Sequence, residues 1–90
     1  MCWTYILYSA SADRFYVGST GNIADRIRRH NQGRSKYTKF GRPWVLVFSK
    51  IFDSKSEAYQ FELLIKSKKS REFILELTKN WTNSENLDIS

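Results

Sequence analysis

Cysteine, proline and glycine are scarce in this chain of 90 residues, which contains one Cys, one Pro and four Gly. The single cysteine, Cys2, cannot form an intrachain disulfide and cannot build a cysteine-based metal site. A chain without a disulfide framework agrees with a reducing compartment, and we expect a cytoplasmic protein. The composition therefore excludes a disulfide-stapled scaffold.

Long apolar runs are also missing, so we expect neither a membrane helix nor a secretory signal peptide. Hydrophobic residues make up 41% of the chain and charged residues 27%, which is the ordinary balance of a globular protein. Ninety residues are enough for one domain with one modest core. We expect that domain over residues 1–79, followed by a polar tail over residues 80–90, in which Trp81 could dock back onto the domain.

Acidic residues are absent between Arg26 and Lys50, although the chain carries a net charge of +6. Aromatic residues, among them Phe40 and Trp44, are interleaved with the basic residues of this stretch. Such a pattern favours a surface for a polyanion, most simply nucleic acid, over a solvated surface that happens to be basic. The residues that we expect to contact phosphates are Arg28, Arg29, Arg34, Lys36, Lys39, Arg42, Lys66, Lys68 and Lys69.

Three segments have the pattern of β-strands. Residues 3–9 and 14–18 are aromatic and β-branched, and the short polar link between them predicts an antiparallel hairpin. Residues 44–51 are apolar enough for a third strand that is buried on at least one face. Gly18, which ends the second segment, is expected to need a backbone conformation that other residues avoid.

The first predicted helix begins after Asn22, a good N-cap residue, and ends near residue 31. Ile23 and Ile27 lie one turn apart and are expected to face the core. Arg26 and His30 are also one turn apart, on the flank of that apolar stripe. Helical geometry thus separates this pair from the solvated basic residues around it.

A second helix is predicted from the capping box that Ser54 and Glu57 form. Glu62 is placed at the edge of its apolar stripe, and a basic patch over residues 66–71 separates this helix from a third one around residues 73–77. The residues of the expected stripe are Ala58, Phe61, Leu64 and Ile65.

Several motifs together resemble the GIY-YIG nuclease family, in particular its small stand-alone members. The first family triplet falls on residues 3–5 and the second on residues 16–18, while the helix arginine falls on Arg26 and the metal-binding glutamate on Glu62. Residues 65–71 are similar to the C-terminal signature of the small members, and the resemblance covers roughly residues 3–78. The first triplet departs from the family pattern, because Trp3 stands where the family has glycine.

The resemblance implies an α+β fold, with a small three-stranded antiparallel sheet flanked by about three helices. It implies a DNA endonuclease that hydrolyses phosphodiester bonds with Mg²⁺ or Mn²⁺ held by Glu62. Arg26 would stabilise charge on the phosphate, and Tyr5 would position water or phosphate. Either Tyr16 or His30 would accept the proton of the attacking water, and the sequence leaves that choice open.

Simpler explanations exist for each of these residues. Tyr5 and Tyr16 could be ordinary strand residues, Arg26 a surface cation, and His30 a residue favoured at a helix C-terminus. Glu62 could merely pair with a lysine one turn on. Two other functions also stay open at this point: a DNA-binding or accessory module with the same fold, and a protein directed at RNA. A homodimer or a protein partner could add specificity for duplex or branched DNA.

Overall fold

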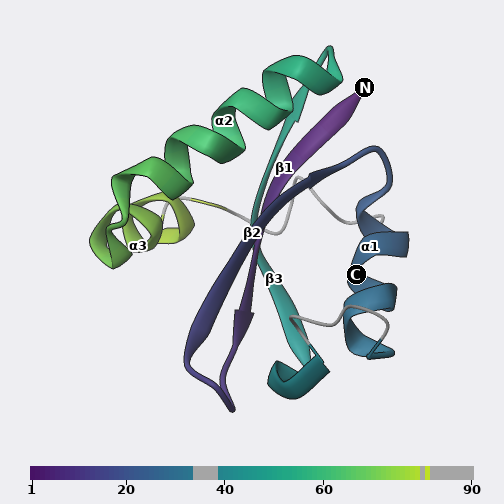
Figure 1. Ribbon diagram of the computed structural model, residues 1–90, viewed down its shortest axis with the longest axis vertical. Coiled ribbons are helices and arrows are strands. Elements are labelled where there is room, and N and C mark those ends of the chain that lie inside the picture. The colour runs from purple at the N-terminus through teal and green to yellow at the C-terminus, as the bar shows by residue number, and fades with distance from the viewer. Residues whose placement is uncertain (34–38, 80, 82–90) are drawn as a thin grey trace.

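The computed structural model describes residues 1–33, 39–79 and 81 of the chain (Figure 1). Three antiparallel strands, β1 (Cys2–Ser9), β2 (Arg14–Thr20) and β3 (Trp44–Phe52), form one sheet in the order β2-β1-β3. β1 is therefore central, and β2 is an edge strand. The predicted α+β fold with a three-stranded antiparallel sheet is confirmed.

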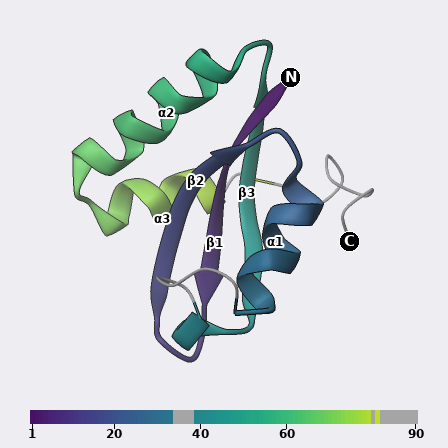
Figure 2. The same ribbon diagram turned by 45° about the vertical axis from the view of Figure 1, so that its right-hand side comes forward.

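Helices cover both faces of the sheet (Figures 1 and 2). α1 (Ile23–Asn31) packs on one face, and α2 (Lys55–Lys68) and α3 (Arg71–Lys79) pack on the other. A short 3-10 turn, η1 (Lys39–Gly41), precedes β3. In the part of the chain that the structure describes, no helix has the length and apolar character needed to cross a membrane.

Both predicted N-caps are present. The side chain of Asn22 accepts a hydrogen bond from the Asp25 amide at 3.0 Å. Ser54 accepts from the Glu57 amide at 3.2 Å and donates to the Glu57 carboxylate at 2.9 Å, which completes the capping box. These bonds satisfy amides that have no partner inside a helix, and so they fix where α1 and α2 begin.

The alternation of side chains along the strands produces two apolar clusters, one on each face. On the α1 face, a buried set is surrounded by partly buried residues, which are Trp3, Tyr16, Ile27 and Leu46. On the other face, Trp81 packs with the apolar residues of α2 and α3. The rest of the predicted tail, residue 80 and residues 82–90, lies outside the described residues. The buried sets are Tyr5, Leu7, Ile23 and Trp44 on the α1 face, and Ile6, Val17, Phe48 and Ile65 on the α2 face.

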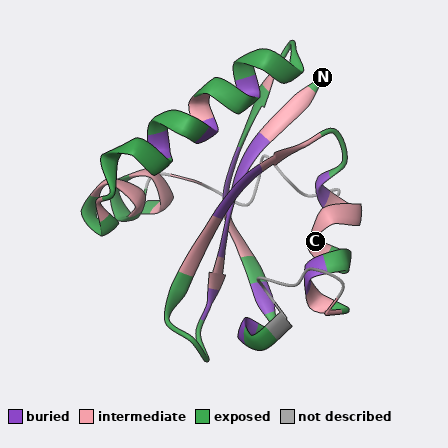
Figure 3. Ribbon diagram, in the orientation of Figure 1, coloured by how far each residue is buried: buried purple, intermediate pink, exposed green. Residues whose placement is uncertain are grey.

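The predicted stripe of α2 is wrong at one position. Leu64 is 44% exposed, whereas Glu62 is only 8% exposed. Position 62 lies one helical turn after position 58, and position 65 lies two turns after it, so the three buried residues share the face of α2 that is turned to the sheet (Figure 3). The helix is therefore rotated so that a carboxylate, and not a leucine, points at the edge of the sheet.

Two polar contacts fix the helices on the sheet. On one face, the buried hydroxyl of Thr4 on β1 donates to the Ala58 carbonyl of α2 at 2.6 Å. On the other face, the Asn31 side chain accepts from the Trp44 amide at 2.5 Å and donates to the Trp44 carbonyl at 3.1 Å. The Thr4 contact lies one turn before Glu62, and the Asn31 contact follows His30 directly. Each contact therefore fixes the helical turn that carries a candidate site residue.

Candidate active site

The phenol of Tyr5 crosses the edge strand at Gly18. The register pairs Tyr5 with Gly18 and Leu7 with Tyr16, so the two tyrosines are diagonal neighbours and not directly opposite each other. Their ring centroids are 6.4 Å apart. A Cβ atom on Gly18 would lie 2.6 Å from the Tyr5 hydroxyl oxygen and 2.8 Å from its Cζ. Glycine is thus required for space at this position.

This explanation of Gly18 corrects the sequence-based one. Among the described glycines, only Gly33 has a positive φ, at 76°. Gly18 therefore has a backbone conformation that other residues also adopt. β2 continues two residues beyond the predicted end, because Ser19 and Thr20 pair with Thr4 and Trp3 on β1.

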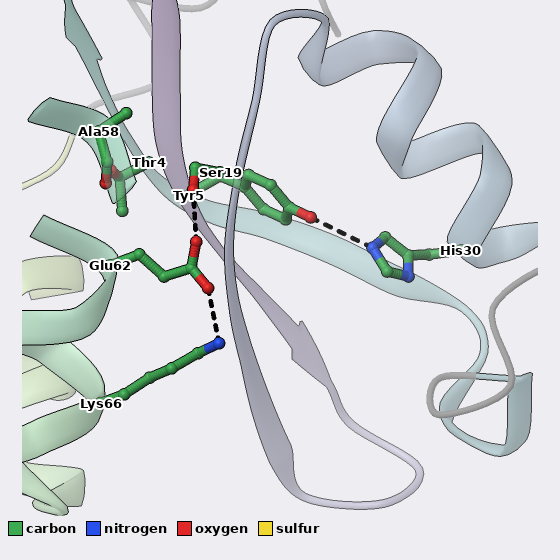
Figure 4. A network of polar contacts seen from close by, with 7 residues as sticks. All are labelled: Thr4, Tyr5, Ser19, His30, Ala58, Glu62 and Lys66. Carbon is green, nitrogen blue, oxygen red and sulfur yellow. Dashed lines mark hydrogen bonds and ion pairs between the residues drawn. The ribbon is translucent and has the colours of Figure 1, made fainter. Parts of the chain in front are cut away.

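His30 lies in the last turn of α1 and is almost fully buried, with 2% of its surface exposed. Its Nε2 atom is 3.3 Å from the Tyr5 hydroxyl oxygen (Figure 4). The ring of Tyr16 meets the imidazole edge-on, with 4.8 Å between centroids. The imidazole is therefore enclosed by two phenol rings, one of which, Tyr16, is only partly buried.

Burial and neighbouring charges set the protonation of this group. Burial, with the positive charges of Arg26 and Arg29, lowers the pKa of His30 below its usual value of 6.5. Burial is the main cause that raises the pKa of the Tyr5 phenol well above its usual range, and the neighbouring Tyr16 is the second cause. The positive charge of Arg26 opposes that shift. At neutral pH the imidazole is uncharged and the phenol keeps its proton. Tyr5 donates to Nε2 when the imidazole proton is on Nδ1, and Nε2–H donates to the Tyr5 oxygen in the other tautomer, which leaves Nδ1 as the proton acceptor.

Arg26 lies one turn before His30 on α1 and is partly buried. Its positive charge opposes the rise in the pKa of Tyr5 and contributes to the lowered pKa of His30, so the guanidinium acts on both groups. A fixed guanidinium beside neutral hydrogen-bonding groups can bind a phosphate with two parallel bonds. Arg28, in contrast, points into solvent and pairs with Asp25 at 3.6 Å.

Glu62 lies on the opposite side of β2 from these groups (Figure 4). One carboxylate oxygen accepts a hydrogen bond from the Ser19 hydroxyl, and the other accepts from the Lys66 ammonium at 2.6 Å. The negative charge of Glu62 is one of the influences that raise the pKa of Tyr5. The carboxylate and the phenol therefore interact electrostatically across the edge strand.

The candidate active site thus has two halves on opposite faces of β2, one beside Gly18 and the other beside Ser19. We call the first the α1 half-site, on the α1 face, and the second the Glu62 half-site, on the α2 face. Four of the five predicted catalytic residues lie together in the first, and the fifth lies in the second. Their catalytic roles remain predictions. The α1 half-site contains Tyr5, Tyr16, Arg26 and His30, and the Glu62 half-site contains Glu62, Ser19 and Lys66.

The donor atoms of the Glu62 half-site suit a hard divalent cation. The carboxylate and the Ser19 hydroxyl supply oxygen ligands, which Mg²⁺ and Mn²⁺ prefer. Across residues 1–33, 39–79 and 81, no group of three or more His, Cys, Asp or Glu side chains could hold a metal ion. The residues therefore fit an ion that takes most of its ligands from water and phosphate, and such an ion is held weakly by the protein alone.

The predicted phosphate-contacting residues fall into two groups. Arg28, Arg29 and Arg42 are exposed on or near α1, and Lys66, Lys68 and Lys69 are exposed at the end of α2. Arg34 and Lys36 lie outside the described residues, and so does the side chain of Lys39. These contacts also remain predictions.

A basic groove of about 360 Å³ adjoins the Glu62 half-site, between β2 and the junction of α2 with α3. Its basic residues are Arg14, Lys66, Lys69 and Arg71, and Phe15 is among the apolar residues that also line it. Arg71 is paired with Asp13 at 2.6 Å. Sequence reasoning missed Arg14 and Ser19, although the basic residue that opens β2 was a visible signal for the groove.

Comparison with known protein families gives one match that covers most of the chain. A family model described as the GIY-YIG catalytic domain matches residues 1–75. The chain is 36% identical over 84 residues to a UPF0213 protein of Pediococcus pentosaceus, a match that covers 92% of this chain and 87% of that protein. It is 38% identical over 69 residues to UPF0213 protein YazA of Bacillus subtilis, covering 73% and 70%.

Two further similarities extend this result. The chain is 51% identical over 53 residues to UPF0213 protein SH2523 of Staphylococcus haemolyticus, covering 58% of this chain and 65% of that protein, slightly less than two thirds of it. The solution NMR structure of the UPF0213 protein BH0048 from Bacillus halodurans is similar over the full length of both chains, with 28% identity and a TM-score of 0.55. That similarity independently supports the α+β fold.

The lowered pKa of His30 can be measured directly, since it is the single histidine of the chain. We expect its imidazole proton signals to titrate in NMR with a midpoint below 6.5. The unfolded chain then binds a proton at a higher pH than the folded protein, so stability is complete above 6.5 and falls as the pH drops below it. In the His30→Gln variant, the melting temperature should fall less than in the wild type as the pH drops below 6.5. A midpoint at or above 6.5 would contradict the burial argument.

Proposed function

The chain belongs to the GIY-YIG family, and we propose that it is a divalent-metal-dependent endonuclease that hydrolyses phosphodiester bonds in DNA. Membership of this nuclease superfamily rests on the match over residues 1–75. The metal dependence, the DNA substrate and the residue roles are the proposal. The observation that supports it most is that neighbouring residues of the edge strand contact the two half-sites: Tyr5 lies over Gly18, and Ser19 hydrogen-bonds Glu62.

Hydrolysis requires a water oxygen to attack phosphorus, while the bond from phosphorus to the leaving sugar oxygen breaks. The water gives up a proton to a group of the site, and the leaving sugar oxygen gains one from solvent water. We propose that Tyr16 accepts the water proton as it passes its own phenolic proton to the imidazole of His30. Tyr16 is only partly buried and can reach a substrate, whereas His30 is enclosed behind it and neutral at physiological pH. A neutral imidazole is a competent proton acceptor.

The other two residues of the α1 half-site act as donors in this scheme. Arg26 would bind the non-bridging phosphate oxygens and stabilise the charge that grows on them. Tyr5, whose raised pKa keeps its proton in place, would accept a hydrogen bond from Nε2–H of His30 and donate its own proton to the phosphate, and would not serve as a base. Their fixed positions mean that the protein need not reorganise when charge develops on the phosphate.

Glu62 is the proposed metal ligand, with the Ser19 hydroxyl beside it. A divalent ion held there would act as a Lewis acid on the phosphate. Because a single carboxylate leaves most ligand positions to water and substrate, the protein without DNA should bind the ion weakly. In this proposal Glu62 and the α1 half-site would act on the same phosphate from the two sides of the edge strand.

The basic groove beside Glu62 is the surface that we assign to the substrate strand. Its cations could neutralise phosphates that flank the one being cut, and its apolar lining could contact sugars. Contacts of this kind position the nucleic acid and do not read its sequence. This agrees with a preference for the shape of a branched substrate over a base sequence.

The metal assignment predicts the behaviour of Glu62→Gln. This change keeps the volume and an acceptor for Ser19, but it removes the charge that attracts a divalent ion. We expect cleavage of end-labelled duplex, flap and four-way DNA with Mg²⁺ or Mn²⁺ to fall by roughly 100-fold or more. The Glu62→Gln protein should still bind DNA. The wild type should cut an RNA of matched shape less well than the DNA.

Glu72→Gln is the matched control, because Glu72 is exposed on α3 and has no predicted role. It should cut like the wild type. If folded wild-type protein binds DNA but cuts none of these substrates, the protein is better described as a DNA-binding module. The lack of cleavage would then be explained by Ser19 and Lys66, which occupy both Glu62 oxygens. Equal cleavage by Glu62→Gln and wild type would refute the role of Glu62.

The groove assignment predicts a change in the salt dependence of DNA binding. Each phosphate contact that is lost should reduce the slope of log affinity against log salt by about 1. Arg14→Ala and Lys69→Ala should each show this reduction in fluorescence anisotropy. Lys55→Ala is the control, because it lies at the other end of α2, roughly 20 Å away along the helix. An equal reduction in all three variants would place the DNA elsewhere.

A further inference from the structure

Lys66 forms an ion pair with Glu62, the carboxylate that the proposed function assigns to a metal ion. Its ammonium lies 2.6 Å from one Glu62 oxygen, while Ser19 occupies the other. Glu62 is 8% exposed, so its negative charge has little contact with water. A buried carboxylate needs a compensating charge or hydrogen bonds, and these two residues supply both.

We propose that Lys66 is an internal counter-cation of Glu62 that a divalent ion must displace. This inference rests on the proposed function, because it takes Glu62 as the metal ligand. An ammonium and a divalent ion at one carboxylate repel each other, and the burial of Glu62 reduces the screening of the two charges at that carboxylate. The two cations therefore compete for Glu62.

The structure gives Lys66 the freedom that such an exchange requires. Its side chain is 50% exposed and ends a flexible four-carbon chain, so it can move without disturbing the fold. It also lines the basic groove together with Arg14 and Lys69. The displaced ammonium would therefore stay beside the site, where substrate phosphates could take the place of the Glu62 carboxylate.

Competition has a functional consequence. Without a metal ion, Lys66 neutralises Glu62 and keeps the carboxylate in its position at the sheet edge. In the presence of DNA, phosphates in the groove attract Lys66 away from Glu62 and so favour metal binding. Metal ion and nucleic acid would then reinforce each other's binding, and the protein alone would hold its ion weakly.

The test is Mn²⁺ binding to the protein without DNA, read from the electron paramagnetic resonance signal of free Mn²⁺. Lys66→Met removes the competing charge and should bind Mn²⁺ roughly three- to tenfold more tightly than the wild type. Lys66→Gln, which keeps a hydrogen-bond donor but no charge, should show the same direction. Lys68→Met is the matched control, since Lys68 is exposed on the same last turn, and it should bind within roughly twofold of the wild type.

Each outcome has a distinct meaning. Tighter binding by both Lys66 variants, with Lys68→Met unchanged, supports the exchange. Unchanged or weaker binding by the Lys66 variants overturns it, provided that Glu62→Gln still abolishes Mn²⁺ binding and so keeps the metal assignment in place. Binding by Glu62→Gln equal to that of the wild type overturns the metal assignment itself, and the inference with it. Thermal melts of every variant confirm that each protein is folded.

Discussion

The crossing of Tyr5 over Gly18 is the contact on which the rest of the candidate site depends. β2 is an edge strand, and a side chain of ordinary size at position 18 would occupy the space of the Tyr5 phenol. With glycine there, the phenol extends over the strand to His30, while the next residue, Ser19, hydrogen-bonds Glu62 on the other face. Two adjacent residues of β2 thus contact groups that two helices supply from opposite faces.

The remaining geometry follows from ties that hold those helices in register with the sheet. Thr4 ties α2 to the central strand, and Asn31 ties the end of α1 to β3. The α1 half-site combines a neutral imidazole and a protonated phenol with a fixed guanidinium, whereas the Glu62 half-site carries a carboxylate that is already compensated. The two halves are therefore complementary: one supplies hydrogen-bond donors and a proton acceptor, and the other supplies an anion for a cation.

Sequence patterns predicted the elements well because each depended on local rules. Strand alternation, the caps at Asn22 and Ser54, and the burial of Ile23 required no knowledge of the tertiary fold. The pairing of Glu62 with Lys66 one turn on was foreseeable from spacing within α2. The errors arose where packing between elements decides. The rotation of α2 that buries Glu62 and exposes Leu64, and the contact of Glu62 with Ser19, depend on how α2 docks against the sheet edge, and the spatial requirement at Gly18 depends on where Tyr5 crosses β2. Periodicity within one helix does not specify that docking.

The most direct test of this account is the cost of Gly18→Ala, measured by urea unfolding in two backgrounds. An added methyl group would meet the Tyr5 phenol at 2.6 Å, and overpacking of this kind destabilises by roughly 1–3 kcal/mol. In a Tyr5→Leu background, which removes the crossing phenol, the same change should cost clearly less. A cost that is equal in the two backgrounds, or absent in both, would contradict the claim that Gly18 is needed to let Tyr5 cross the strand.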